Sequence, residues 1–262
     1  MPNWCRNKII VGNKAKMDEL VKAHCRIDKD TGFPEMDFNT IKKMPDELNI
    51  EYGTKSDDGI ALYLARKNPA CDFYGSKADK MTEKDYAAFL AKIEDSWSLS
   101  MSADKPMDND RLAKMKEKYK DCGLDSVEKL GKTCIDNFFK YGAMNWYEWS
   151  VANWGTKWNA CDTNVSGSEM TFDTAWDPAI PAMVAMSALH KDMPIAMLFA
   201  DEQTGAHTGY VLMKNGKIDD SGSFREFSVD AYKLAFNVWG NEDEYIYDTD
   251  KKTYVRKELQ ED

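Results

Sequence analysis

The chain has 262 residues, of which 43% are hydrophobic and 31% charged, a balance that excludes collagen and mainly disordered proteins. Its formal net charge of -10 disfavours nucleic acid as a partner, because an acidic surface repels phosphate. No apolar run approaches the roughly 18–20 residues that span a bilayer, and the first residues lack the apolar core of a signal peptide. We therefore expect a soluble, cytoplasmic protein without a membrane partner.

The N-terminal part alternates between strand and helix patterns. Residues 8–11 form a β-branched run that ends at Gly12, as expected for a strand that enters a turn. Residues 14–26 place apolar side chains at helical spacing, and residues 36–41 alternate like a second strand. The expected order is strand, helix, strand.

The middle of the chain is dominated by helix patterns. Residues 59–67 fit either a strand or a buried helical turn. Thr82 and Ser126 are candidate N-caps of two of the helices that follow. Because residues 81–142 carry almost no strand pattern, we expect a helical insertion there. The predicted helices of this block cover residues 82–97, 110–121 and 126–141.

The second half returns to mixed patterns that resume the opening order. This order favours an α+β fold with a ferredoxin-like antiparallel sheet, helices on one face and a helical insertion. The expected organisation is an N-terminal part of the core over 1–80, the insertion over 81–142 and a C-terminal part over 143–262. Predicted helices cover 145–154, 179–189 and 229–238, predicted strands cover 156–162, 169–176, 194–200 and 209–214, and a hairpin is predicted over 244–258.

Residues 145–160 contain four of the eight tryptophans, and this segment is the leading candidate for a site. One interpretation is an aromatic core in which each indole N–H has found an acceptor. The other is a surface that stacks on a base, nucleotide or sugar ring. On the second interpretation, the predicted ligand-binding residues are Trp146, Trp149, Asn153, Trp154, Lys157, Trp158, Asp173 and Trp176.

Signatures of common enzymes are missing from the sequence. It has no Walker loop, dinucleotide-binding glycine motif, nucleophile elbow or HExxH helix. Six cysteines without a CxxC pair and three histidines give no zinc-ligand spacing. We therefore predict no catalytic residues, metal or cofactor. A metal-dependent hydrolase or nuclease stays open as an alternative, since four acids lie near the tryptophan segment: Glu148, Glu169, Asp173 and Asp177.

A resemblance to a known family is carried by four segments: residues 1–12, 38–48, 145–162 and 172–183. They resemble the YubB-type proteins of plasmids and phages, whose carboxyl half is described as ferredoxin-like. The resemblance implies a mobile-element setting and carries no settled reaction. We therefore expect a non-enzymatic, counter-defence binding protein for a host protein or small nucleotide-like ligand in the host cytoplasm, with single-stranded nucleic-acid binding as a further alternative.

Overall fold

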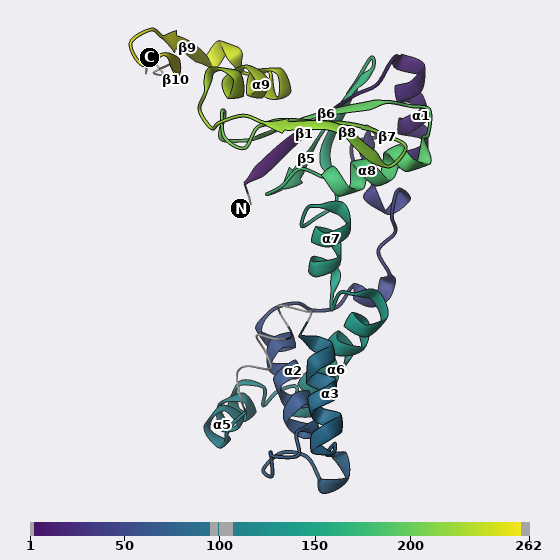
Figure 1. The fold of residues 1–262 in the computed structure, drawn as a ribbon, viewed down its shortest axis with the longest axis vertical. Helices are drawn as coiled ribbons and strands as arrows, with labels where there is room; N and C mark the ends of the chain where they lie inside the picture. The colour runs from purple at the N-terminus through teal and green to yellow at the C-terminus, as the bar shows by residue number, and fades with distance from the viewer. Residues whose placement is uncertain (1–2, 95–98, 100–106, 258–262) are drawn as a thin grey trace. The chain divides into compact units, whose positions relative to one another are not determined.

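The computed structural model describes residues 3–94, 99 and 107–257. The chain divides into two compact units, drawn together in Figure 1. Unit 1 consists of Met1–Lys43 and Ser150–Asp262, and unit 2 of Met44–Trp149. These limits differ from the predicted segments 1–80, 81–142 and 143–262. Within the described residues, no helix is both long and apolar enough to cross a membrane.

Unit 1 is built on a six-stranded sheet with the order β4-β5-β1-β6-β7-β8. Every neighbouring pair of strands is antiparallel. The α+β class with an antiparallel sheet is therefore confirmed. The strands are β1 (Trp4–Ile10), β4 (Cys161–Ser166), β5 (Glu169–Ala175), β6 (Ile195–Asp201), β7 (Gly209–Lys214) and β8 (Lys217–Ser223).

Both faces of this sheet carry helices, and the alternation along β1 shows which residues each face buries. Cys5, Asn7 and Ile9 are fully buried on the face that packs on α1 (Lys14–His24) and α8 (Ile180–Leu189). Arg6 and Lys8 point to the opposite face, as alternation requires. There α9 (Val229–Trp239) packs against β6 and β1, so helices lie on two faces rather than one. Figure 1 shows α8 and α9 on opposite sides of the sheet.

Shorter elements flank the sheet of unit 1. The strand expected over 36–41 is wrong beyond Met36, because a turn of 3-10 helix, η1 (Phe38–Thr40), follows it. The Asp37 side chain accepts a hydrogen bond from the Asn39 backbone N–H and so starts this turn. The predicted C-terminal hairpin is confirmed. The small hairpins are β2 (Cys25–Ile27) with β3 (Pro34–Met36), and β9 (Tyr245–Asp248) with β10 (Thr253–Arg256).

Two strands in the second half of the chain differ from the predictions. The strand expected over 156–162 begins only at Cys161. Residues before it make hydrogen bonds to segments other than a neighbouring strand. Thr156 Oγ1 donates to the Ala175 carbonyl, and Asn159 Oδ1 accepts from the Phe38 backbone N–H. The edge strand β8 was not predicted at all. Its side chains are almost all exposed, so it buries no face that could impose an apolar period of two.

Unit 2 is a bundle of helices with short turns. Residues 59–67 belong to a helix, α2, and not to a strand. Gly59 and Gly131 lie where α2 crosses α6, since a Cβ at Gly131 would stand 1.9 Å from the Gly59 carbonyl carbon. This crossing places α2 with the helices, which explains why the unit begins before residue 81. Its elements are η2 (Asp46–Leu48), α2 (Thr54–Lys67), η3 (Lys77–Asp79), α3 (Glu83–Ile93), α5 (Asn109–Lys118) and α6 (Leu124–Tyr141).

Helix ends were predicted with mixed success. Thr82 caps α3 as expected, because its side chain accepts from the Asp85 backbone N–H. The Ser126 cap is wrong, since α6 begins after Gly123, whose φ of 75° a glycine adopts without strain. The helix α7 (Trp146–Trp154) is confirmed. The end of the predicted 82–97 helix lies outside the described residues.

Candidate functional site

Three tryptophans and one lysine of unit 1 form a surface cluster, which we call the tryptophan–lysine cluster: Trp4, Lys157, Trp158 and Trp176. The Lys157 ammonium lies 4.7 Å from the ring centre of Trp158 and 4.6 Å from that of Trp176. Trp4 and Trp158 have ring centres 6.3 Å apart at an angle of 47°. Trp158 and Trp176 remain 39% and 41% exposed. Large aromatic side chains that stay this open are typical of binding surfaces.

The loop after α7 positions Lys157 and Trp158. Gly155 ends the helix with φ of 85°, and a Cβ there would stand 2.4 Å from Cδ of Pro181, so only glycine fits this approach. Thr156 Oγ1 donates to the Ala175 carbonyl over 2.9 Å. Ser150 Oγ donates to the Lys157 carbonyl over 2.9 Å. The loop is thus anchored at both ends, next to the end of β5.

Trp176 occupies an unusual backbone conformation. Its φ is 72°, in the left-handed region that bulky side chains rarely adopt. The Trp176 backbone N–H donates to the Asn3 carbonyl over 2.9 Å, and Thr174 Oγ1 donates to the Asp177 carbonyl over 2.8 Å. These bonds hold the turn and direct the indole outward. Strained backbone of this kind is found preferentially at functional sites.

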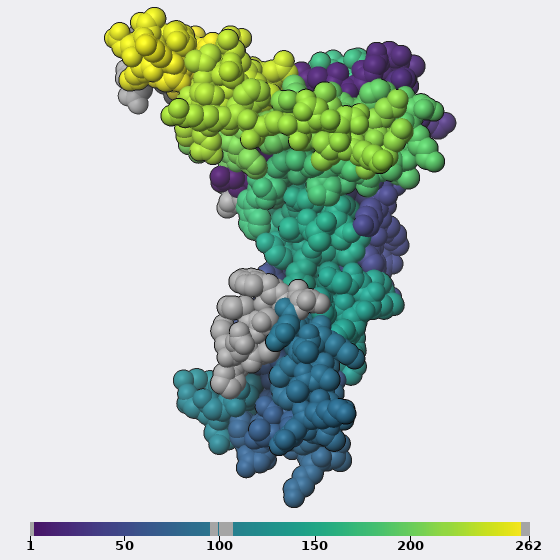
Figure 2. All heavy atoms as spheres, viewed as in Figure 1, coloured from purple at the N-terminus to yellow at the C-terminus, as the bar shows by residue number. Residues whose placement is uncertain are grey.

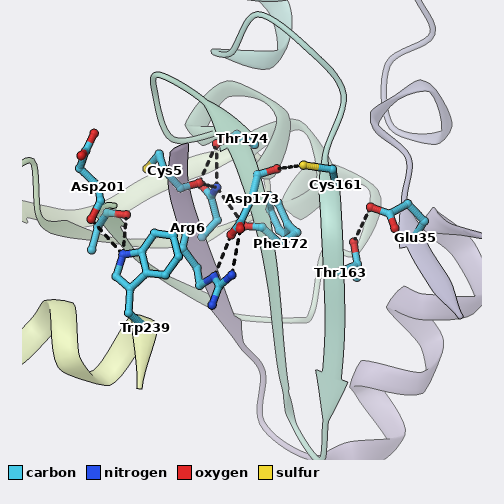
Figure 3. A network of polar contacts seen from close by, with 12 residues as sticks. Cys5, Arg6, Glu35, Cys161, Thr163, Phe172, Asp173, Thr174, Asp201 and Trp239 are labelled. Carbon is cyan, nitrogen blue, oxygen red and sulfur yellow. Dashed lines mark hydrogen bonds and ion pairs between the residues drawn. The ribbon is translucent and has the colours of Figure 1, made fainter. Parts of the chain in front are cut away.

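Asp173, a predicted ligand-binding residue, is engaged inside the protein. Arg6 donates from Nε and Nη2 to its two carboxylate oxygens over 2.8 and 2.9 Å, which raises the pKa of the Arg6 guanidinium. The guanidinium carbon also lies 4.1 Å from the ring centre of Trp239 on α9. Figure 3 shows the guanidinium and carboxylate pointing toward each other beside this indole. Asp173 therefore helps to fix α9 on the sheet.

Trp154 is a core residue. It is only 4% exposed, its Nε1 donates to the Lys42 carbonyl over 3.0 Å, and its ring lies 5.8 Å from that of Phe38. For Trp154, the interpretation as part of a packed aromatic core is therefore the right one. Asn153 is half-buried on the same helix.

Trp146 and Trp149 lie in unit 2. Trp149 is 5% exposed. Trp146 is half-buried and makes edge contacts with Tyr52 and Tyr147, whose rings stack at 4.9 Å. Of the eight predicted residues, the structure brings Lys157, Trp158 and Trp176 together in one exposed cluster of unit 1.

The site also contains residues that the sequence analysis did not select. Trp4 completes the tryptophan–lysine cluster, and Arg6 holds Asp173. The repeated Asn–Trp pair at residues 3–4, 145–146 and 153–154 was the available signal for Trp4. For Arg6 no local signal existed, because its partner is 167 positions away.

The acids near the tryptophan segment do not form a cation site in the structure. Among the described residues, no group of three or more His, Cys, Asp or Glu side chains is arranged to hold a metal ion. Asp173 accepts from Arg6 with both oxygens, so this carboxylate is already engaged within the protein.

Comparison with known proteins places the second half of the chain. Residues 153–253 match the family model of the ferredoxin-like domain in Api92-like protein, which confirms the expected ferredoxin-like domain. No curated protein matches the chain. A crystal structure of protein api92 from Yersinia pseudotuberculosis is similar at 12% identity, covering 86% of this chain and 99% of that one. Its TM-score is 0.35, which is too low to support any conclusion about fold or function.

Proposed function

We propose that this protein is a non-enzymatic binding protein and that the tryptophan–lysine cluster is its ligand contact. The observation that carries the proposal is the pair of half-exposed indoles, Trp158 and Trp176, that both contact the Lys157 ammonium. Flat aromatic rings stack on such indoles with little dependence on ring identity. A lysine beside them adds a donor for a phosphate group.

A small nucleotide-like ligand fits these properties. Its base would stack on an indole. Its phosphate would attract the Lys157 ammonium, which without ligand makes cation–π contacts with both indole rings. The hydrogen bonds of the turn at Trp176 hold its backbone in one conformation before the ligand arrives, which reduces the entropy lost on binding.

The test is calorimetric titration with purine mononucleotides and cyclic dinucleotides. Trp158→Ala and Trp176→Ala are each expected to weaken binding about fivefold or more, because base stacking contributes roughly 1–3 kcal/mol per base. Lys157→Met keeps the aliphatic stem and removes the charge. It should weaken binding of the nucleotide and leave binding of the matching nucleoside unchanged.

Phe227→Ala is the matched control. Phe227 is also an exposed aromatic of unit 1, at 42%, and also has a positive φ, at 57°, but it lies outside the cluster. It should bind as the wild type does. If no nucleotide binds at millimolar concentration, the nucleotide-like ligand is excluded. If Phe227→Ala weakens binding as much as Trp176→Ala, the cluster is not the contact.

The proposed biological setting rests on the resemblance to YubB-type proteins. We propose that the chain comes from a phage or plasmid and counters a host defence in the host cytoplasm. It would do so by binding a nucleotide signal and thereby lowering its free concentration. A host protein is the other partner that the same surface could bind, and capture from host lysate by wild type but not by Trp158→Ala would identify it. An assay of phage or plasmid survival in a defended host, with and without the Trp176→Ala variant, tests the setting.

A further inference from the structure

Two histidines far apart in the sequence meet inside unit 1. His24 is the last residue of α1 and His190 caps the C-terminal end of α8. Their Nε2 atoms are 2.8 Å apart, a hydrogen-bond distance. His24 is 3% exposed and the His190 side chain 10% exposed. Water therefore has little access to the bond between the two rings.

The outer nitrogen of each ring also has a partner. His190 Nδ1 lies 2.9 Å from Glu19 Oε1, and His24 Nδ1 lies 3.0 Å from Thr40 Oγ1. The Thr40 hydroxyl lies 2.7 Å from the Asp37 carbonyl, and donating its single proton there leaves its oxygen to accept from His24. A continuous chain of hydrogen bonds therefore runs from Glu19 through both rings to Thr40.

Counting protons along this chain gives its charge. The contacts of Glu19 with His190, His190 with His24, and His24 with Thr40 need one proton each. An ionised Glu19 and two neutral imidazoles supply only two, because a neutral ring has one N–H. One additional proton is needed, and both rings lie at helix C-termini, where the helix dipole favours positive charge.

We propose that Glu19, His190, His24 and Thr40 form a histidine clamp that retains one extra proton at neutral pH and opens when a second one enters on acidification. A second extra proton would put an N–H on both facing Nε2 atoms and break their bond. The clamp joins α1, α8 and η1, and Phe38 of η1 contacts the core residue Trp154. Opening would therefore loosen the support beneath the loop that carries the tryptophan–lysine cluster.

Other charged groups around the clamp belong to the elements packed on it. A hollow of about 350 Å³ opens beside His190, and its charged lining comes from α1 and from the residues after α8. Asp37 is engaged with Asn39 and Asn159, and burial raises the pKa of the Cys25 thiol to about 11. The groups in question are Lys16, Glu19, Cys25, Asp37, Lys191 and Asp192.

The pH range follows from His24. Burial, and secondarily the charge of His190, lowers the pKa of His24 from 6.5 to about 4. An unfolded chain takes up this proton near 6.5, so the folded state loses stability as pH falls from 6.5 to about 4 and no further below that. Above 6.5 this second proton has no effect on stability.

Nitrogen NMR of the imidazole rings tests the proposal on the wild-type protein, which has three histidines. At pH 7.5 we expect one ring with both nitrogens protonated and one ring protonated at Nδ1 alone. Two singly protonated rings for His24 and His190 would overturn the proposal. So would a shift of both Nε2 signals on addition of one equivalent of Zn²⁺, because the pair would then be a metal site.

Variants test which groups hold the proton. Glu19→Gln should release it at a pH lower by about one unit, since it removes the opposite charge. Asp18→Asn removes a neighbouring carboxylate that is paired with Lys14 instead and should change nothing. Equal effects of the two substitutions would contradict the clamp.

The difference in unfolding free energy between wild type and His24→Gln should shrink from pH 6.5 to 4. A difference that stays constant over this range would also overturn the proposal.

Discussion

At the scale of single residues, burial decides which polar groups carry structural weight. Arg6 and Lys8 project from the same face of β1, and each pairs with a carboxylate on β5. The partner of Arg6, Asp173, is 7% exposed at its side chain, whereas Glu169, the partner of Lys8, is 44% exposed. Breaking the Arg6–Asp173 pair should therefore lower the free energy of unfolding far more than breaking the Lys8–Glu169 pair.

Arg6→Met should destabilise the protein by about 3 kcal/mol, because it leaves the Asp173 carboxylate buried without its cation. Lys8→Met is the matched control and should cost below about 1 kcal/mol, because Glu169 is 44% exposed and keeps its water when its cation is removed. Chemical denaturation at pH 7 measures both. Equal losses for the two variants would show that burial of Asp173 does not decide the cost.

The sequence revealed some of these residues and concealed others. Lys157, Trp158 and Trp176 could be selected because tryptophans are rare and cluster visibly in residues 145–160 and near 176. Trp154 belongs to the same string, yet it is a core residue, because composition does not tell which side of a helix faces the sheet. The His24–His190 contact joins positions 166 apart, which no local pattern can indicate.

At the scale of elements, the crossing of α2 and α6 is the tightest helix contact in the described part of unit 2. Gly59 and Gly131 allow the two backbones to touch, and apolar clusters lie around them. One cluster contains Ile60, Ile93 and Cys134, and the other Leu62, Leu112 and Val127. Both depend on the distance between the same two helices.

Gly131→Ala should therefore destabilise unit 2 by at least about 2 kcal/mol, because the new methyl group overlaps the Gly59 backbone and the helices must separate. Gly12→Ala is the control, since the nearest atoms to a Cβ there are 3.9 Å away. Guanidinium denaturation followed by circular dichroism compares them. An unchanged midpoint for Gly131→Ala would mean that the helices do not touch at this position.

Periodicity predicted most elements that bury one face and failed for those that do not. The helices α3, α6 and α8 have long apolar stripes or runs, and they were found within a few residues. Residues 59–67 stayed ambiguous, because the glycine at the crossing interrupts an apolar stripe just where the helix is most buried. The strand β8 escaped notice since it has no buried face, and alternation exists only where one face is buried.

At the scale of the whole molecule, the six cysteines are distributed over both units as free thiols. Cys5, Cys71 and Cys134 are buried, and Cys122 alone is exposed. Burial raises the pKa of Cys134 to about 12 and, together with nearby acids, that of Cys161 to about 12. A thiol reacts through its thiolate. Cys134 and Cys161 are therefore unreactive for two reasons: reagents reach them poorly, and their raised pKa keeps them protonated.

A thiol reagent such as DTNB should label one cysteine rapidly at pH 8 in the folded protein and all six in guanidinium. The rapid fraction should disappear in Cys122→Ser. More than one rapidly labelled cysteine in the folded wild type would show that a half-buried thiol, Cys25 or Cys161, is more accessible than the structure indicates.

The strand β8 lies at one margin of the sheet, and Figure 2 shows the yellow-green atoms around it as a continuous band on the surface of unit 1. A margin of this kind is a template on which a second copy can extend the ladder and start a fibre. Asp219 and Asp220 stand in the middle of β8, so a second copy aligned there would face like charges at close range. Self-association along this edge is thereby discouraged, and the protein can keep the sheet open there.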